Sequence, residues 1–427
     1  MKSLLNLLFF LAFHFTASFA QDQPNIILIM ADDLGYETLQ CNGGSSYITP
    51  ELNALAQNGV RFTKAYSMPL CTPSRVQIMT GKYNFRNYTQ FGLLEAEEKT
   101  FANLLKEAGY ATAIAGKWQL GGGVEAPYHF GFDEYALWQI NPGDFWYRYK
   151  DPKVYKNGKL MGQNRGMYGP DIYTDFLLDF IERKANEGQP FLAYYPMCLV
   201  HDPFQPTPAL DDYTEFELKG LNHPTYFDDM MTHMDNIIGK VVAQLDNLGI
   251  RDNTLIIFTG DNGTDQAVVS LANGKVVRGG KGMPIERGTH VPLIVSYPAY
   301  DSAGLVSEHL IDFTDILPTL ADAAKVAVGS DYGNDGQSFL AQLQGDDVKA
   351  REWIFCDYNS GKIQFPIVRY AQDYQYKLYD SGQLYNYVLD PEETQPINPY
   401  TLTRSHQSRF QKLKAILDKF QKEQQTD

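Results

Sequence analysis

Short apolar segments alternate along the chain with segments whose apolar residues recur at helical spacing. The first apolar segment, Asn25-Ile26-Ile27-Leu28-Ile29-Met30, is almost uninterrupted, which is typical of a central strand covered on both faces. Further buried strands are predicted at residues 111–115, 191–196, 254–258 and 291–296. The alternation predicts an α/β fold, with a large, mainly parallel or mixed central sheet sandwiched by helices.

Capping signals mark the beginning of two predicted helices. Thr49-Pro50 provides an N-cap and a proline in the first helical turn, and Gly59 closes that helix. Thr100 is the predicted cap of a second helix, which ends at Gly109. A third helix is predicted over residues 226–248 from its apolar spacing.

The pattern changes near residue 345. Residues 353–389 are rich in tyrosine, alternate in polarity and contain the turn pairs Ser360-Gly361 and Ser381-Gly382, which predict a small antiparallel sheet. A charged amphipathic helix is predicted at 403–424. We therefore expect a large domain over residues 21–345 and a small C-terminal subdomain over 346–427.

The first twenty residues have the pattern of a secretory signal peptide. Lys2 begins an apolar run over residues 4–15, and Ser18-Phe19-Ala20 forms a small-x-small cleavage site. The run is short for a membrane span. We expect an exported chain without a membrane anchor, periplasmic in a bacterium and secreted or lysosomal otherwise.

The amino-acid composition limits the class of protein and the molecules that it is expected to bind. The chain has 427 residues, with 36 Lys and Arg against 51 Asp and Glu, a formal net charge of −15. Its 44% hydrophobic content excludes a disordered or fibrous chain, and its acidity argues against nucleic acid as a partner. Four widely spaced cysteines exclude a CxxC motif but allow one or two disulfides: Cys41, Cys71, Cys198 and Cys356.

Acidic residues follow two of the predicted strands. Asp32-Asp33 comes directly after the first strand, and Asp261-Asn262 follows the strand at 254–258 through Thr259-Gly260. The carboxyl ends of strands form the ligand crevice of open α/β sheets, so these side chains are expected to converge. Carboxylate and amide oxygens suit Ca²⁺ or Mg²⁺, although either pair alone could simply start a turn.

The segment Cys71-Thr72-Pro73-Ser74-Arg75 resembles the C-x-P-S-R signature of the sulfatase family, within the alkaline phosphatase superfamily. The resemblance extends from about Pro24 to Asp390. It implies that a formylglycine-generating enzyme oxidises Cys71 to an aldehyde. The hydrated aldehyde would attack the sulfur of a sulfate ester and later expel sulfate.

The resemblance also implies roles for other residues, and a Ca²⁺ ion beside residue 71. Arg75 would steady the nucleophile and the metal site. Lys117, in Gly116-Lys117-Trp118, and Lys281, in Gly279-Gly280-Lys281-Gly282, would contact sulfate, and His201 would contact sulfate or assist the leaving group. The implied metal ligands are Asp32, Asp33, residue 71, Asp261 and Asn262.

One position departs from the family pattern G-K-W-H-L-G, because this chain has Gln119 in place of the histidine. Glutamine cannot carry a proton at neutral pH, but it can bind substrate through hydrogen bonds. Any acid–base function of this position would then fall to His201, Lys281 or water. We expect a functional variant site, since every nucleophile and metal position is retained.

An aromatic segment precedes a hairpin predicted at Asn157-Gly158. Aromatic faces can carry sugar rings, so the segment is either a carbohydrate subsite or a packing cluster. Its members are Trp138, Phe145, Trp146, Tyr147 and Tyr149.

The leading interpretation is an exported, Ca²⁺-dependent sulfuric ester hydrolase acting on a sulfated saccharide. A phosphoester or phosphonate hydrolase of the same superfamily remains an alternative, because phosphate and sulfate have the same shape. A non-catalytic binder of sulfated glycans is another, if Cys71 stays a thiol. The acidic net charge does not oppose an anionic substrate, since the local field in the cleft governs what enters it.

Overall fold

The computed structural model describes residues 23–141, 143–144, 148–162, 164–215, 220–300, 302–345, 350–361 and 364–426. The predicted signal peptide and the aromatic residues Phe145, Trp146 and Tyr147 lie outside these ranges. Within the described ranges, every helix is too short or too polar to cross a membrane.

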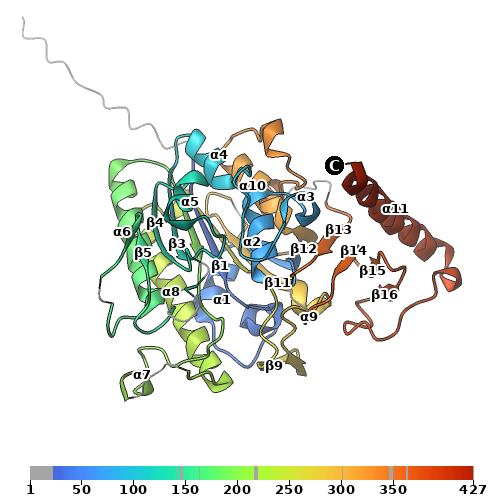
Figure 1. The fold of residues 1–427 in the computed structure, drawn as a ribbon, viewed down its shortest axis with the longest axis horizontal. Helices are drawn as coiled ribbons and strands as arrows, with labels where there is room; N and C mark the ends of the chain where they lie inside the picture. The colour runs from blue at the N-terminus through green and yellow to red at the C-terminus, as the bar shows by residue number, and fades with distance from the viewer. Residues whose placement is uncertain are drawn as a thin grey trace, which may run out of the picture.

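A mixed sheet forms the centre of the molecule (Figure 1). It has ten strands in the order β12-β2-β11-β8-β1-β7-β3-β4-β5-β6. Its strands are β1 (Asn25–Ala31), β2 (Val60–Tyr66), β3 (Ala111–Lys117), β4 (Glu134–Trp138), β5 (Tyr155–Lys156), β6 (Lys159–Leu160), β7 (Phe191–Pro196), β8 (Thr254–Gly260), β11 (His290–Ser296) and β12 (Leu305–Asp312).

The middle of the sheet is parallel, and antiparallel strands occur toward its edges. Strand β1 pairs in parallel with both β7 and β8, and β3 continues this parallel group to β4. Strand β11 runs antiparallel to β8 and β2, and the β5–β6 hairpin turns at Asn157-Gly158 as predicted. All seven residues of β1 are buried, as its apolar sequence predicts. The predicted α/β class is confirmed.

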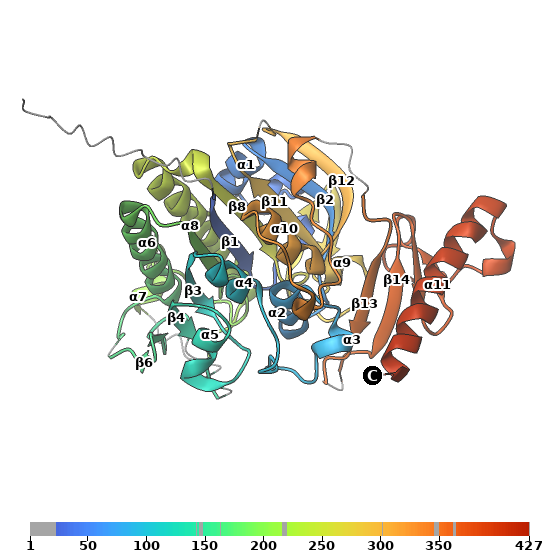
Figure 2. The ribbon, with the colours of Figure 1, turned by 90° about the horizontal axis from the view of Figure 1, so that it is seen from above.

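Helices cover both faces of the sheet, and the two perpendicular views show the helical layers on either side of it (Figures 1 and 2). One face packs against α1 (Pro50–Gln57), α6 (Gly169–Glu187) and α8 (Phe227–Asn247). The other face packs against α2 (Cys71–Thr80), α4 (Phe101–Glu107), α5 (Ala126–His129) and α10 (Ile316–Ala323). Alternate residues of β1 belong to the two cores, Ile27 to the first and Ile26 to the second.

The two predicted N-caps have different outcomes. Thr100 accepts hydrogen bonds from the amides of Ala102 and Asn103 and forms a capping box with the Asn103 side chain. Thr49 precedes α1 as predicted, but its hydroxyl makes no capping hydrogen bond. The carboxylate of Asp235, from α8, instead accepts from the first amides of α1. The cap of α1 is therefore a tertiary contact.

A second, four-stranded antiparallel sheet lies at one end of the molecule, with α11 (Arg404–Thr426) against it (Figure 2). Its strands are β13 (Ile354–Tyr358), β14 (Val368–Gln372), β15 (Tyr376–Tyr379) and β16 (Leu384–Asn386). The predicted C-terminal sheet and helix are thus present. Other short elements include α3 (Asn84–Asn87), α7 (Asp212–Glu215), α9 (Glu286–Thr289) and the hairpin of β9 (Val269–Ala272) with β10 (Lys275–Arg278).

Candidate active site

Four polar side chains meet where β1 and β8 end. The two strands are parallel and in register up to the pair Ala31–Gly260, so the residues that follow them lie side by side. The Asp33 backbone N–H donates to Asp261 Oδ1 at 2.9 Å. Asp32, Asp33, Asp261 and Asn262 are all fully buried. Carboxylates are rarely buried without a partner of opposite charge, so this edge requires cations.

Asn262 is held in one orientation at this edge. Its Nδ2 donates to Asp33 Oδ1 at 2.8 Å, which leaves its Oδ1 buried without a hydrogen-bond partner in the described part of the chain. Ligand atoms of Asp32, Cys71 and Asp261 also lie within 4.8 Å of one another. An orphaned amide oxygen among carboxylates is a suitable donor set for a hard divalent cation. The residues at this edge therefore fit the calcium ion that the sequence motif implies.

Three basic side chains contact the same carboxylates. Lys117, the last residue of β3, places Nζ 2.8 Å from each oxygen of Asp32. Arg75 donates to Asp261 Oδ2 at 2.9 Å, and Lys281 Nζ lies 2.5 Å from Asp33 Oδ2. The site thus holds a cluster of matched opposite charges away from solvent.

The matched charges shift the ionisation of the buried groups. Burial by itself would raise the pKa of Asp32, but Lys117, His201 and Arg75 hold it well below its usual range. Burial and the nearby charge of Asp32 raise the pKa of Asp261 to about 7, although Arg75 opposes this. Strongly shifted carboxyls in a cleft are a mark of functional sites.

Cys71 is the first residue of α2, and it is only 2% exposed. The loop before it is held by Ser74, whose hydroxyl donates to the carbonyl of Met68 at 3.1 Å. The helix closes at Gly81 in the left-handed conformation, at φ 68°. A helix N-terminus presents free N–H groups and positive potential, so residue 71 lies where an anionic group is favoured.

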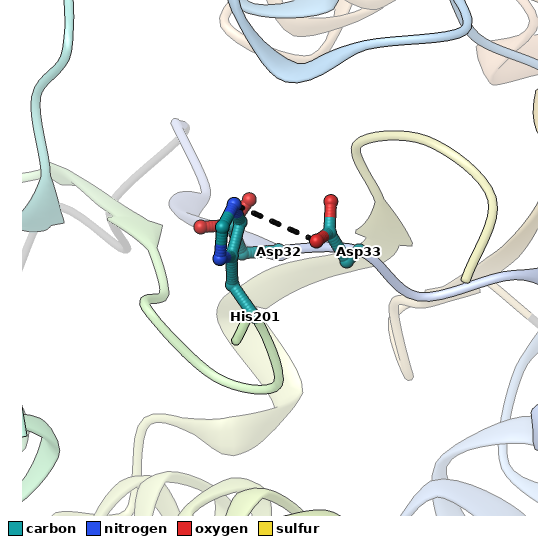
Figure 3. Close-up of side chains that lie close together, drawn as sticks. All are labelled: Asp32, Asp33 and His201. Atoms are coloured by element: carbon teal, nitrogen blue, oxygen red, sulfur yellow. Dashed lines mark ion pairs between the residues drawn. The ribbon is translucent and has the colours of Figure 1, made fainter. Parts of the chain in front are cut away.

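His201 reaches the same cluster from the loop after β7 (Figure 3). Its Nε2 lies 2.9 Å from Lys281 Nζ and 3.6 Å from Asp33 Oδ2. Its Nδ1 lies 2.7 Å from both Asp202 Oδ1 and an Arg148 guanidinium nitrogen. The motif analysis missed Arg148 and Asp202. Asp202 adjoins His201 in sequence and could have been suspected, whereas Arg148 lies in a segment without a motif.

The sequence profile of the sulfatase family matches residues 24–326. The chain belongs to the sulfatase family. Mouse N-acetylgalactosamine-6-sulfatase is 31% identical over 363 residues, which cover 77% of this chain and 67% of the relative. The N-acetylgalactosamine-6-O-sulfatase of Bacteroides thetaiotaomicron is 30% identical over 412 residues, covering 78% of each chain.

The fold agrees with this membership. The crystal structure of Ps i-CgsB in complex with k-i-k-neocarrahexaose superposes with a TM-score of 0.77 at 26% identity, over 93% of this chain and 92% of that one. The two chains therefore share their fold over nearly all of this chain.

Gln119 makes no side-chain hydrogen bond with the other expected site residues that the structure describes. It follows β3 by two residues, in the left-handed conformation at φ 57°. Its backbone N–H donates to the carbonyl of Gln139 at 3.3 Å, but its buried Oε1 has no partner among the described residues. All the other expected site residues are linked by the contacts above.

The aromatic segment is partly in the core. Trp138 and Tyr149 are both buried against the helices of one face of the sheet, and the guanidinium of Arg148 lies 4.4 Å from the centre of the Trp138 ring. Trp138 and Tyr149 therefore belong to the hydrophobic core. The four cysteines are free thiols, so neither of the disulfides that the sequence allowed is present.

Proposed function

We propose that this sulfatase hydrolyses a sulfate monoester of a saccharide at the cluster around residue 71. One observation carries the proposal: Lys117, Lys281 and Arg75 meet buried carboxylates beside the N-terminus of the helix that begins with Cys71. With a divalent cation held by the carboxylates, this cluster would carry net positive charge, which suits a tetrahedral anion such as a sulfate monoester. The relatives named for N-acetylgalactosamine 6-sulfate support a sulfated saccharide as the substrate class.

We further propose that Asp32, Asp33, Asp261 and Asn262 hold a calcium ion. All four are oxygen donors, and the free Oδ1 of Asn262 has no other use in the described structure. A divalent cation there would supply positive charge that polarises the bound sulfate group. Arg75 would then keep Asp261 and Asp32 in place through its contacts to both.

Residue 71 is proposed to be formylglycine, formed from Cys71 by a maturation enzyme. The hydrated aldehyde would supply an oxygen nucleophile that the thiol lacks. Since Cys71 is 2% exposed in the folded chain, the maturation enzyme would have to act before α2 packs. Export through the segment 1–20 fits an enzyme that meets glycans outside the cytoplasm.

The chain's own residues divide the remaining tasks. Lys117 and Lys281 would neutralise the charge of the sulfate group, and Lys281 keeps its proton because Asp33 holds its pKa well above the usual range against the effect of burial. His201 Nε2 lies beside Lys281. In its imidazolium form, His201 would give its Nε2 proton to the leaving oxygen and be left as the neutral imidazole with Nδ1–H. Asp202 would orient the imidazole through its contact with Nδ1.

A comparison of aryl esters tests the proposal. The matured protein is given 4-nitrophenyl sulfate or 4-nitrophenyl phosphate, and kcat/KM is measured for each. We expect faster hydrolysis of the sulfate, lost in Cys71→Ala but retained in Cys356→Ala, which removes a buried free thiol from β13. Faster hydrolysis of the phosphate would favour the phosphoester alternative. Binding of sulfated glycans without any hydrolysis would favour the non-catalytic one.

A further inference from the structure

Two glutamines lie side by side at the carboxyl ends of neighbouring strands. In the parallel pair β3–β4, Lys117 is the register partner of Trp138. The pairing continues past the strands, because the N–H groups of Trp118 and Gln119 donate to the carbonyls of Trp138 and Gln139. Gln139 directly follows Trp138, whereas Gln119 comes two residues after Lys117, so the two glutamines are joined by a backbone hydrogen bond one residue out of register, at the edge of the sheet that carries Lys117.

Both glutamines have an unfavourable backbone conformation. Their φ angles are 57° and 60°, in the left-handed region that residues with a side chain seldom adopt. Strain of this kind is retained where the position of a side chain has a use.

The carboxamide oxygens of both glutamines are also buried and unpartnered. Gln119 is 8% exposed and Gln139 4% exposed, and the Oε1 of each makes no hydrogen bond within the described residues. Neither amide nitrogen donates to a described residue, so the two side chains do not even pair with each other. A buried polar group without a partner lowers the stability of the free protein, so folding gives no reason for these two amides.

We propose that Gln139, together with Gln119, binds the hydroxyl groups of the sugar next to the sulfate, which makes Gln139 a specificity-determining residue. A carboxamide both donates and accepts, as a hydroxyl does, and it stays neutral. It can therefore form hydrogen bonds with the hydroxyl groups of a sugar ring without competing with Lys117 and Lys281 for the sulfate. The inference rests on the proposed function and extends it from the sulfate group to the saccharide.

The test compares substrates with and without sugar hydroxyls. Gln139→Met keeps the length of the side chain but removes its hydrogen-bonding groups. The probes are 4-nitrophenyl sulfate and whichever of galactose 6-sulfate, glucosamine 6-sulfate and N-acetylgalactosamine 6-sulfate the unaltered enzyme hydrolyses fastest. We expect kcat/KM to fall at least about tenfold for the sugar sulfate and less than about twofold for the aryl sulfate. The melting temperature should stay the same or rise, because an unpartnered buried amide is lost.

Gln372→Met is the matched control, since Gln372 is a buried glutamine of β14 whose Oε1 also lacks a partner. It should leave the ratio of the two kcat/KM values unchanged. If Gln139→Met does not fold, Gln139→Asn, which tolerates a positive φ, should show the same selective loss.

Equal losses on both probes, or no loss on the sugar sulfate, would overturn the inference and leave the proposed function intact. Sulfate release by the unaltered enzyme from the aryl ester alone would also overturn it. Failure of the unaltered enzyme on every sulfate ester would overturn the proposed function and this inference with it.

Discussion

Arg75 and Asp261 form an ion pair of 2.9 Å in which the side chains are 1% and 0% exposed. Arg75 belongs to α2, the helix that begins with Cys71, and Asp261 follows β8. The pair therefore ties the residue proposed as nucleophile to the residues proposed as metal ligands. A charge pair so deeply buried cannot lose one partner without leaving the other uncompensated.

Replacement of Arg75 by alanine should lower the free energy of unfolding by about 3–5 kcal/mol, because it leaves buried carboxylates without their cation. Denaturant unfolding followed by circular dichroism measures this. Arg183→Ala provides the control, as Arg183 is 38% exposed where it pairs with Glu134 and Asp179, and its loss should cost no more than about 1 kcal/mol. Similar losses in the two variants would contradict the account.

Calcium should stabilise the protein against heat. An ion that binds only the folded chain adds about 2.7 kcal/mol at a hundred times its dissociation constant. The chelator-treated protein should therefore regain melting temperature as CaCl₂ is added. Asn262→Ala should weaken this response, whereas Asn58→Ala, which alters an exposed residue at the end of α1, should not. A melting temperature independent of calcium in the unaltered protein would refute the proposed metal site.

Gln119 should bind the substrate without gaining or losing a proton itself. Gln119→His restores the family pattern and adds a group with an ordinary pKa near 6.5. We expect the variant to remain active and the pH profile of its kcat/KM to gain a limb between about pH 6 and 7. If the unaltered enzyme also shows a limb in this pH range, that limb must come from a titrating residue other than Gln119. Identical profiles in the two proteins would show that residue 119 lies outside the reaction's proton transfers.

Glu286 should make the protein less stable as the pH rises. Burial raises its pKa from 4.5 to about 7, although Lys377 opposes this, so the folded chain holds a proton that the unfolded chain releases. The stability that this proton gives to the folded chain is fully present below pH 4.5 and is lost as the pH rises through 7.

Glu286→Gln removes that titration. The free energy of unfolding of the variant relative to the unaltered protein should therefore increase between pH 5 and pH 8, by about 2.5 kcal/mol. Glu125→Gln, at an exposed glutamate, should show no such change. A relative stability of Glu286→Gln that does not vary with pH would mean that Glu286 is ionised throughout.

The features predicted correctly from sequence depend on local signals. The uninterrupted apolar run of β1 requires burial on both faces, and the parallel pairing of β1 with β8 brings the acidic residues after them together. The N-cap at Thr100 and the turn at Asn157-Gly158 are also local, since each is determined by two to four neighbouring residues.

The features that could not be predicted from the sequence depend on contacts between residues far apart in the chain. Asp235 caps α1 from α8, 184 residues away from Glu51 in sequence. Arg148 reaches His201 across 53 residues, and Gln139 becomes notable only when it is seen beside Gln119. No pattern within one segment carries such information. Trp138 likewise could not be assigned to the core until the helices over it were placed.

The chemical state of residue 71 tests the central claim most directly. Mass spectrometry of the tryptic peptide 65–75, from protein isolated in its native host, distinguishes an aldehyde from a thiol. The account predicts formylglycine at position 71, with sulfate release by different preparations in proportion to the fraction converted. An unmodified Cys71 in a preparation that fully retains sulfatase activity would contradict it.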